Sequence, residues 1–210
     1  ALPGTRHKLD IISSNPNPLL RQFAPAWNSV KRIGDLPYLT LYIMQGSNLP
    51  RYEITLSSKD KATLLTNLPD YPRVAAMWEE YKKSVRGEFH AGDYYTNDAD
   101  IRIRGVSPNH WNAVKKSWQI NLPPEKPLGE RTTLRLIIPE DKGWVFHAVN
   151  AKRAIEFGLI SPSVSYVRLH VNGVDMGIYQ LVEAWEESLL EKNGRGLAPL
   201  FSNLNLDVRD

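Results

Sequence analysis

The strongest candidate for chemistry is a lysine in the sequence IRIRGVSPNHWNAVKKSWQINL, residues 101–122. Alternate residues of a strand share one face, which places Lys116 with Val114, Trp118, Ile120 and Leu122 on an apolar face. Burying an unpaired ammonium group is costly, so this lysine needs an anion or an exit to solvent. Two interpretations remain open: a lysine that pairs with a nearby carboxylate, and a lysine that holds a phosphate in a cleft.

The loop before this strand contains small and polar residues suited to phosphate binding. Gly105 allows close approach of the backbone, and Ser107 offers a hydrogen-bond donor. Arg104 at the edge of the loop could contact a phosphate through two hydrogen bonds. The loop matches neither the dinucleotide-binding glycine pattern nor the P-loop pattern. A plain turn between two strands therefore remains the alternative.

The surrounding elements predict an α+β domain built mainly on antiparallel strands. The expected strands are 36–44, 51–57, 98–105, 114–122, 131–139, 164–171 and 176–183. The expected helices are a short one after Ser58, then 73–86, 144–158 and 184–194. An Asn-Gly pair at Asn172 and Gly173 predicts a tight hairpin between the last two strands. Strands with a segregated packed helix indicate the α+β class.

Composition excludes several classes of function. The chain has 210 residues and no cysteine, which excludes a thiolate zinc site and a cysteine nucleophile. A net charge of +3 suits a phosphorylated ligand, but no long Lys/Arg block argues for nucleic acid. The sequence shows no H-E-x-x-H or G-x-S-x-G motif, and we assign no metal ligands. No transmembrane segment is expected, because no apolar stretch is long enough.

Two sequence blocks resemble the spore coat protein H-type (CotH) kinase family. The first is IRIRGVSPNHWNAVKKSWQINL, and the second is SYVRLHVNGVDMGIYQLVEAWEESLLEKN. The sequence YEITLSSKDKATLL is similar to the family's opening strand and helix. The resemblance covers roughly residues 50–195, with its blocks in the family's order.

The resemblance implies transfer of the ATP γ-phosphate to Ser/Thr hydroxyls of a protein substrate, with Mg²⁺ or Mn²⁺ as the metal. It implies a divergent protein-kinase small lobe, in which Lys116 holds the ATP phosphates. Glu156 is the acid in the helix that would orient this lysine. The residues around Glu183 and Ala184 would form the hinge that contacts adenine.

The resemblance also suggests a division of the chain. We expect an extended lead-in over 1–45, a kinase-like nucleotide-binding lobe over 46–184, and a hinge helix with the start of a second lobe over 185–210. Kinases need acids that hold the metal and position the hydroxyl. Asp207 and Asp210 are the late aspartates, and they fit no such motif. The catalytic residues therefore stay unassigned, and we expect the chain to be an inactive N-terminal piece of a kinase.

A second function class is open at this stage. The chain could be a non-catalytic surface or coat module that binds a protein or glycan. By resemblance, the expected location is the bacterial spore coat, the cell surface or the exterior, and the substrate would be a coat or surface protein.

Overall fold

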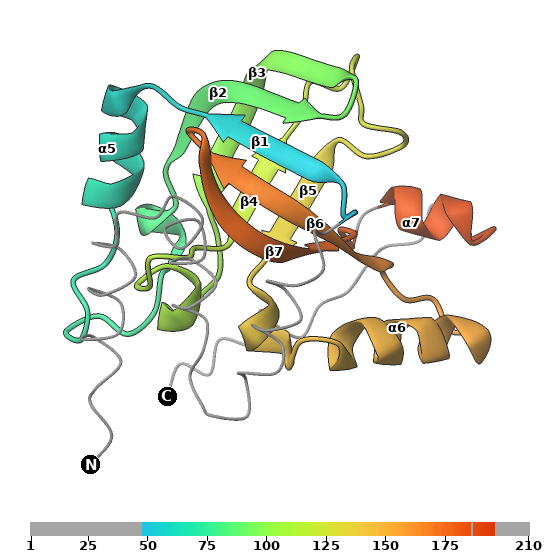
Figure 1. Cartoon of the computed structure of the whole chain (residues 1–210). Helices are drawn as coiled ribbons and strands as arrows, with labels where there is room; N and C mark the ends of the chain where they lie inside the picture. The colour runs from blue at the N-terminus through green and yellow to red at the C-terminus, as the bar shows by residue number, and fades with distance from the viewer. Residues whose placement is uncertain (1–47, 186, 196–210) are drawn as a thin grey trace.

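The fold is a closed barrel of seven strands, seen in a computed structural model that describes residues 48–185 and 187–195 (Figure 1). The strands are β1 (Arg51–Thr55), β2 (Ser84–Ala91), β3 (Tyr94–Ile103), β4 (Trp118–Asn121), β5 (Thr133–Ile137), β6 (Val164–Val171) and β7 (Val174–Val182). The α-helices are α5 (Ser58–Thr66), α6 (Phe146–Glu156) and α7 (Glu187–Lys192). Three short 3₁₀ helices are η2 (Glu79–Tyr81), η3 (Pro108–His110) and η4 (Pro139–Lys142).

The barrel closes because β1 pairs with two strands. The order around the barrel is β1-β2-β3-β4-β5-β7-β6. β1 is antiparallel to β2 and parallel to β6, with Tyr52 opposite Ala91 on one side and Leu169 on the other. Closure satisfies the backbone groups that an open sheet would expose at its edges.

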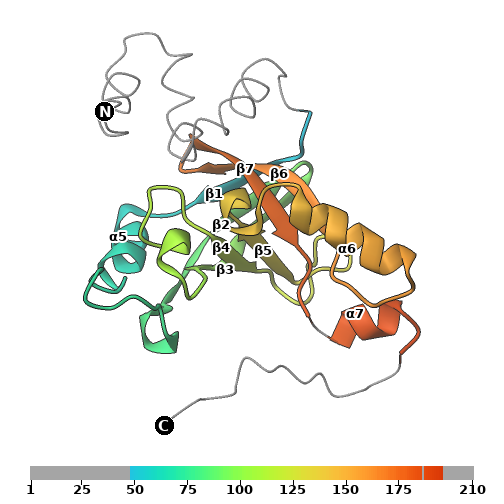
Figure 2. The same ribbon diagram turned by 90° about the horizontal axis from the view of Figure 1, so that it is seen from below.

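The predicted α+β class, with a kinase-like small lobe and a packed helix, is therefore wrong. The seven strands form a closed mixed barrel, and the helices do not form a second core layer. α6 and α7 lie on one side of the barrel and α5 on the opposite side (Figures 1 and 2). In α6 a single residue, Ala151, is buried, while Phe146 is 69% exposed.

The core fills the barrel because inward residues alternate along each strand. The largest fully buried aliphatic and aromatic side chains of the strands are Ile54, Phe89, Ile101, Ile120, Leu134, Leu136, Leu169 and Tyr179. Each large apolar side chain buried in this way contributes about 1.5–3 kcal/mol. The outward partners on β3, β4 and β5 include charged and amide side chains, which become important below.

The helix predicted for 73–86 is wrong. This segment contains η2 and the start of β2. Trp78 is 57% exposed, whereas Met77 is fully buried and its N–H donates to the carbonyl of Val106 at 2.9 Å. β2 buries Val85, Phe89 and Ala91 with period two, and a helical reading obscures that alternation.

Other predicted elements are observed with shifted ends. The strands expected at 51–57, 98–105, 131–139, 164–171 and 176–183, the helix after Ser58, and the helices expected at 144–158 and 184–194 are all present. The strand expected at 114–122 is limited to β4. The strand expected at 36–44, the lead-in over 1–45 and the tail from residue 196 lie outside the described residues.

The hairpin between β6 and β7 has the predicted Asn-Gly turn. Asn172 has φ 51° and Gly173 has φ 77°. The Asn172 side chain also joins the turn to β1: its Oδ1 accepts from the Leu56 N–H at 2.8 Å, and its Nδ2 donates to the Leu56 carbonyl at 2.9 Å. This turn therefore helps to connect the strands that close the barrel.

We expect Gly173→Val to destabilise the fold by roughly 1–3 kcal/mol, because a β-branched side chain is strained at positive φ. Thermal unfolding of the variant measures this effect. Val174→Thr is the control, since Val174 is 56% exposed and the swap keeps the side-chain shape. An unchanged melting temperature for Gly173→Val would contradict the role of the turn.

Candidate functional site

The loop 104–117 is held in one conformation at the end of the barrel where β3 ends and β4 begins. The Arg104 N–H donates to the Ser117 carbonyl at 3.0 Å, and the Ser117 N–H donates to the His110 carbonyl at 2.8 Å. Gly105 has φ +104°, and a Cβ atom there would lie 2.4 Å from the His110 ring. Only glycine therefore fits at this position.

A chain of hydrogen bonds ties this loop to η4. His110 Nδ1 lies 2.8 Å from Ser117 Oγ, and His110 Nε2 lies 3.3 Å from Asp141 Oδ1. Asn109 Nδ2 donates to the same Asp141 oxygen at 2.6 Å. Burial raises the pKa of Asp141, but the hydrogen bond from Asn109 and the neighbouring charges outweigh it, so the net pKa is lowered.

Ser117, His110 and Asp141 have the residue types of a hydrolytic triad, but their arrangement is structural. Ser117 is fully buried, and its Oγ accepts a hydrogen bond from the Ile138 N–H at 3.1 Å. A nucleophile must reach its substrate, which a fully buried hydroxyl cannot do. The three residues fix the loop against η4 instead.

Lys115, next to this network, is the buried lysine of the segment. It is 5% exposed, and its Nζ lies 3.4 Å from Glu140 Oε1 and 5.0 Å from the centre of the Tyr179 ring. Burial lowers the pKa of Lys115, and the carboxylate of Glu140 opposes that shift. The other carboxylate oxygen, Glu140 Oε2, is buried and has no hydrogen-bond partner among the described residues.

The buried lysine is Lys115 and not Lys116. Lys116, predicted on the apolar face, donates from Nζ to the carbonyls of Trp111 and Ala113, both at 2.7 Å. Val114, expected on the same face, is 67% exposed. β4 starts only at Trp118, so strand alternation does not apply to residues 114–117. The face prediction was correct for Trp118, Ile120 and Leu122, which are buried.

Arg104 and Gly105 line a pocket of about 240 Å³ on the outside of the barrel wall. Lys82, Arg102, His110 and Lys142 also line it. Ser107, from the same predicted set, is exposed at the start of η3. The loop thus brings Arg104 and Gly105 into a basic pocket. Lys116 instead donates hydrogen bonds to backbone carbonyls of the same loop.

Glu156 lies at the end of α6, and its ion pair is with Lys152 of the same helix, at 3.8 Å. Its side chain is 61% exposed. The structure does not bring Glu156 to Lys116, whose ammonium group is bonded to the two backbone carbonyls. Among the described residues, Glu140 is the acid that contacts a buried lysine.

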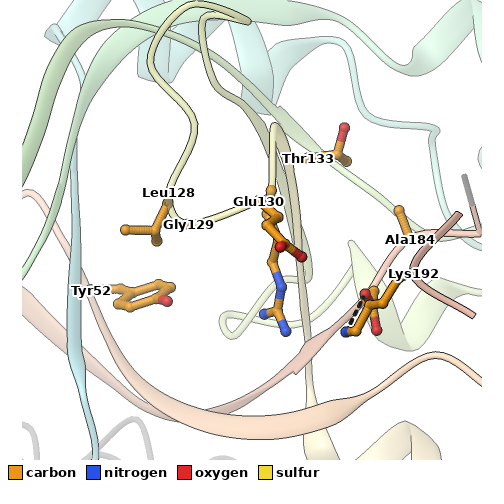
Figure 3. Close-up of a pocket in the computed structure, with 9 residues that line it drawn as sticks. Tyr52, Leu128, Gly129, Glu130, Thr133, Ala184 and Lys192 are labelled. Atoms are coloured by element: carbon orange, nitrogen blue, oxygen red, sulfur yellow. Dashed lines mark hydrogen bonds and ion pairs between the residues drawn. The ribbon is translucent and has the colours of Figure 1, made fainter. Parts of the chain in front are cut away.

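Glu183 and Ala184 line a second pocket, of about 300 Å³ (Figure 3). Tyr52, Leu128 and Lys192 surround them. Burial raises the pKa of Glu183, but its hydrogen bonds from Ser163 and the ion pair with Lys192 at 3.3 Å lower it overall. The Glu183 backbone N–H donates to the Ser163 carbonyl, so this donor is not available for a hydrogen bond to a ligand.

The two pockets lie at opposite ends of the central strands. Trp118 pairs with Leu136 at the end next to the 104–117 loop, and Asn121 pairs with Thr133 at the end next to the second pocket. The residues predicted to bind the cofactor therefore do not share one cavity. A predicted hinge and a predicted phosphate loop are separated by the length of β4.

Sequence reasoning missed Glu140, and it expected Lys116 in the buried position that Lys115 occupies. The available signal was the sequence PEDKG directly after a buried strand, which puts two acids at the end of β5. Sequence alone could not show that this turn packs against Lys115. Elsewhere in the described segments, no group of three or more metal-ligating side chains lies together, so we assign no residue to Mg²⁺ or Mn²⁺.

The barrel carries a buried lysine–glutamate ion pair and a pocket lined by four cationic side chains. A model of the family described as CotH kinase protein matches residues 101–202, from β3 to beyond α7. The resemblance inferred from the sequence is confirmed over this stretch, which covers 102 of the 210 residues and is similar to the CotH kinase family. The segment YEITLSSKDKATLL lies outside the matched range. No curated protein matches the chain. Over the residues described, none of the helices is long and apolar enough to cross a membrane.

Proposed function

We propose that this protein is a CotH-type protein kinase that transfers the γ-phosphoryl group of ATP to Ser/Thr hydroxyls of a protein substrate. The observation that carries the proposal is the buried ion pair of Lys115 and Glu140, in a chain whose residues 101–202 match the family. Protein kinases use a lysine–glutamate pair of this kind to hold the ATP phosphates.

Lys115 has donors for phosphate oxygens, which reach it when the side chains that cover it move, because only 5% of the residue is exposed. An ammonium group has three N–H donors. In the described structure its polar contact is Glu140 Oε1, with the Tyr179 ring on another side, so donors remain for phosphate oxygens. A buried ion pair is a weak source of stability, because desolvation offsets most of the attraction. Its presence here supports a functional role in place of the one predicted for Lys116.

Phosphoryl transfer itself is mostly positioning and charge neutralisation. The substrate hydroxyl oxygen attacks the γ-phosphorus, the bond to the β–γ bridging oxygen breaks, ADP leaves, and the hydroxyl proton is released to solvent. Lys115 would stabilise the charge on the phosphates, with Glu140 fixing the direction of the ammonium group. We assign no catalytic base, and Asp207 and Asp210 lie outside the described residues.

The direct test combines binding and transfer. ATP should stabilise the protein against thermal unfolding, by about 2.7 kcal/mol at a concentration 100-fold above Kd. The chain as the gene encodes it should also transfer labelled γ-phosphate to a Ser-rich peptide, with adenosine as the control ligand. Absence of both effects would overturn the kinase proposal and favour a non-catalytic surface or coat module.

A further inference from the structure

The outer wall of the barrel carries a row of cationic and amide side chains. Arg102 of β3 pairs with Gln119 of β4, which in turn pairs with Arg135 of β5. Their neighbours along the strands, such as Ile101 and Ile120, point into the core. Arg102 Nη2 donates to Gln119 Oε1 at 3.1 Å, which fixes the guanidinium along the wall. Strand pairing therefore holds this basic surface rigidly.

Arg104 extends the row at the rim of the 240 Å³ pocket. Arg104 is half-buried at this rim. Burial, together with the neighbouring charges of Arg135 and Arg102, lowers its pKa to about 10. The Asp141 carboxylate opposes this shift, and the guanidinium stays protonated at neutral pH next to like charges.

The pocket has more positive than negative charge. Lys82, Arg102, Arg104 and Lys142 contribute four cations. Glu79 contacts Lys82 at 2.5 Å and Arg102 at 3.7 Å, and Asp141 contacts Lys142 at 3.1 Å. Those two carboxylates offset two of the cations. The surplus matches the charge of a phosphate monoester, and a guanidinium fork fits phosphate oxygens in bidentate fashion.

We propose that this outer pocket binds a phosphate group, with Arg104 as its central ligand, at a site separate from Lys115. Lys115 contacts Glu140 and Tyr179 at the mouth of the barrel interior, whereas Arg104 lies on the outer wall. The phosphate can come from two sources: free inorganic phosphate or a phosphorylated serine in a peptide. The pocket recognises the dianion common to both.

Calorimetric titration at low ionic strength tests the proposal with two probes, inorganic phosphate and a phosphoserine peptide. The unphosphorylated peptide of the same sequence is the control ligand. We expect binding of at least one phosphorylated probe, weakening as salt increases. Arg104→Met should weaken it at least tenfold. Arg86→Met is the matched control, since Arg86 lies on β2, is 69% exposed and pairs with Asp98 outside the pocket.

Folding and site identity are checked separately. Arg104→Met should unfold at a temperature no lower than the parent protein, because it removes a buried charge next to other arginines. Lys142→Met, at a 43% exposed side chain on the rim, is a second variant that should weaken phosphate binding.

The result assigns the source of the phosphate. Tighter binding of the phosphopeptide than of the unphosphorylated peptide supports a peptide ligand. Binding of inorganic phosphate alone supports the free anion. No binding of either probe, or unchanged binding in both variants, overturns the proposal. Loss of phosphate binding in the presence of saturating ATP would overturn the claim of a separate site.

Discussion

Substitution of Lys115 is expected to weaken ATP binding by about 10–100-fold, which corresponds to the loss of hydrogen bonds to a charged group. The simple variant Lys115→Met leaves Glu140 buried without its cation, at a cost of roughly 3–5 kcal/mol. A loss of ATP binding in this single variant would therefore not distinguish unfolding from the loss of the phosphate contact. The informative protein is the double variant Lys115→Met/Glu140→Leu, which removes both charges and keeps the apolar volume.

The double variant should be about as stable as the parent protein, since replacing a buried ion pair by apolar groups is often neutral or stabilising. Its melting temperature should respond to ATP only at concentrations about 10–100-fold higher than the parent needs. A thermal-shift titration of ATP on the parent, the single variant and the double variant measures both quantities. A stable double variant that binds ATP with the parent's affinity would rule out Lys115 as the phosphate ligand.

Lys116→Met is the matched control, because the two lysines are neighbours in sequence and differ in contacts. Lys116 bonds the carbonyls of Trp111 and Ala113 within its own loop. Its loss should destabilise the loop by about 1–2 kcal/mol and leave ATP affinity within a few-fold of the parent. The strand pattern alone leads to the opposite expectation, so this pair of variants separates the two assignments.

The strand pattern failed at this lysine for a local reason. Alternation holds only where a residue is in the strand, and hydrogen bonding of β4 to its neighbours begins at Trp118. Before that point the chain follows the closed loop that His110 and Ser117 maintain. The sequence identified a lysine at this boundary, but the residue that is buried depends on the loop.

The barrel could not be predicted for a different reason. The hairpins are local, and the Asn172-Gly173 turn was evident from residue types. Closure depends on the parallel pairing of β1 with β6, strands more than a hundred residues apart. No local periodicity encodes that contact, and the amphipathic reading of 73–86 hid β2, the other neighbour of β1.

The candidate site was predicted in part. Arg104 and Gly105 do lie together at a basic pocket, because loop composition is a local property. The partner of the buried lysine was not predictable, because Glu140 comes from a turn twenty-five residues later. The acid selected from the sequence, Glu156, was chosen by its place in a helix, and the helix is mostly exposed.

Gly105→Ala is expected to destabilise the protein by about 2–4 kcal/mol, from backbone strain together with overpacking. At φ +104° an L side chain is rarely accommodated, and the new methyl group would lie 2.4 Å from the His110 ring. The ring cannot easily move away, since Ser117 and Asp141 hold its two nitrogen atoms. For a chain of this size, the melting temperature should fall by roughly 5–15 °C.

Gly92→Ala separates the two causes of this loss. Gly92 also has a positive φ, +62°, but a Cβ atom there would meet no atom within 4 Å. It should cost about 1–2 kcal/mol, the penalty for the left-handed conformation alone. Chemical denaturation of both variants gives the difference, which contains the contact with His110 and the extra backbone strain of φ +104° over φ +62°. Equal losses in the two variants would show that the 104–117 loop yields to the methyl group, and that Arg104 is not rigidly held at its pocket.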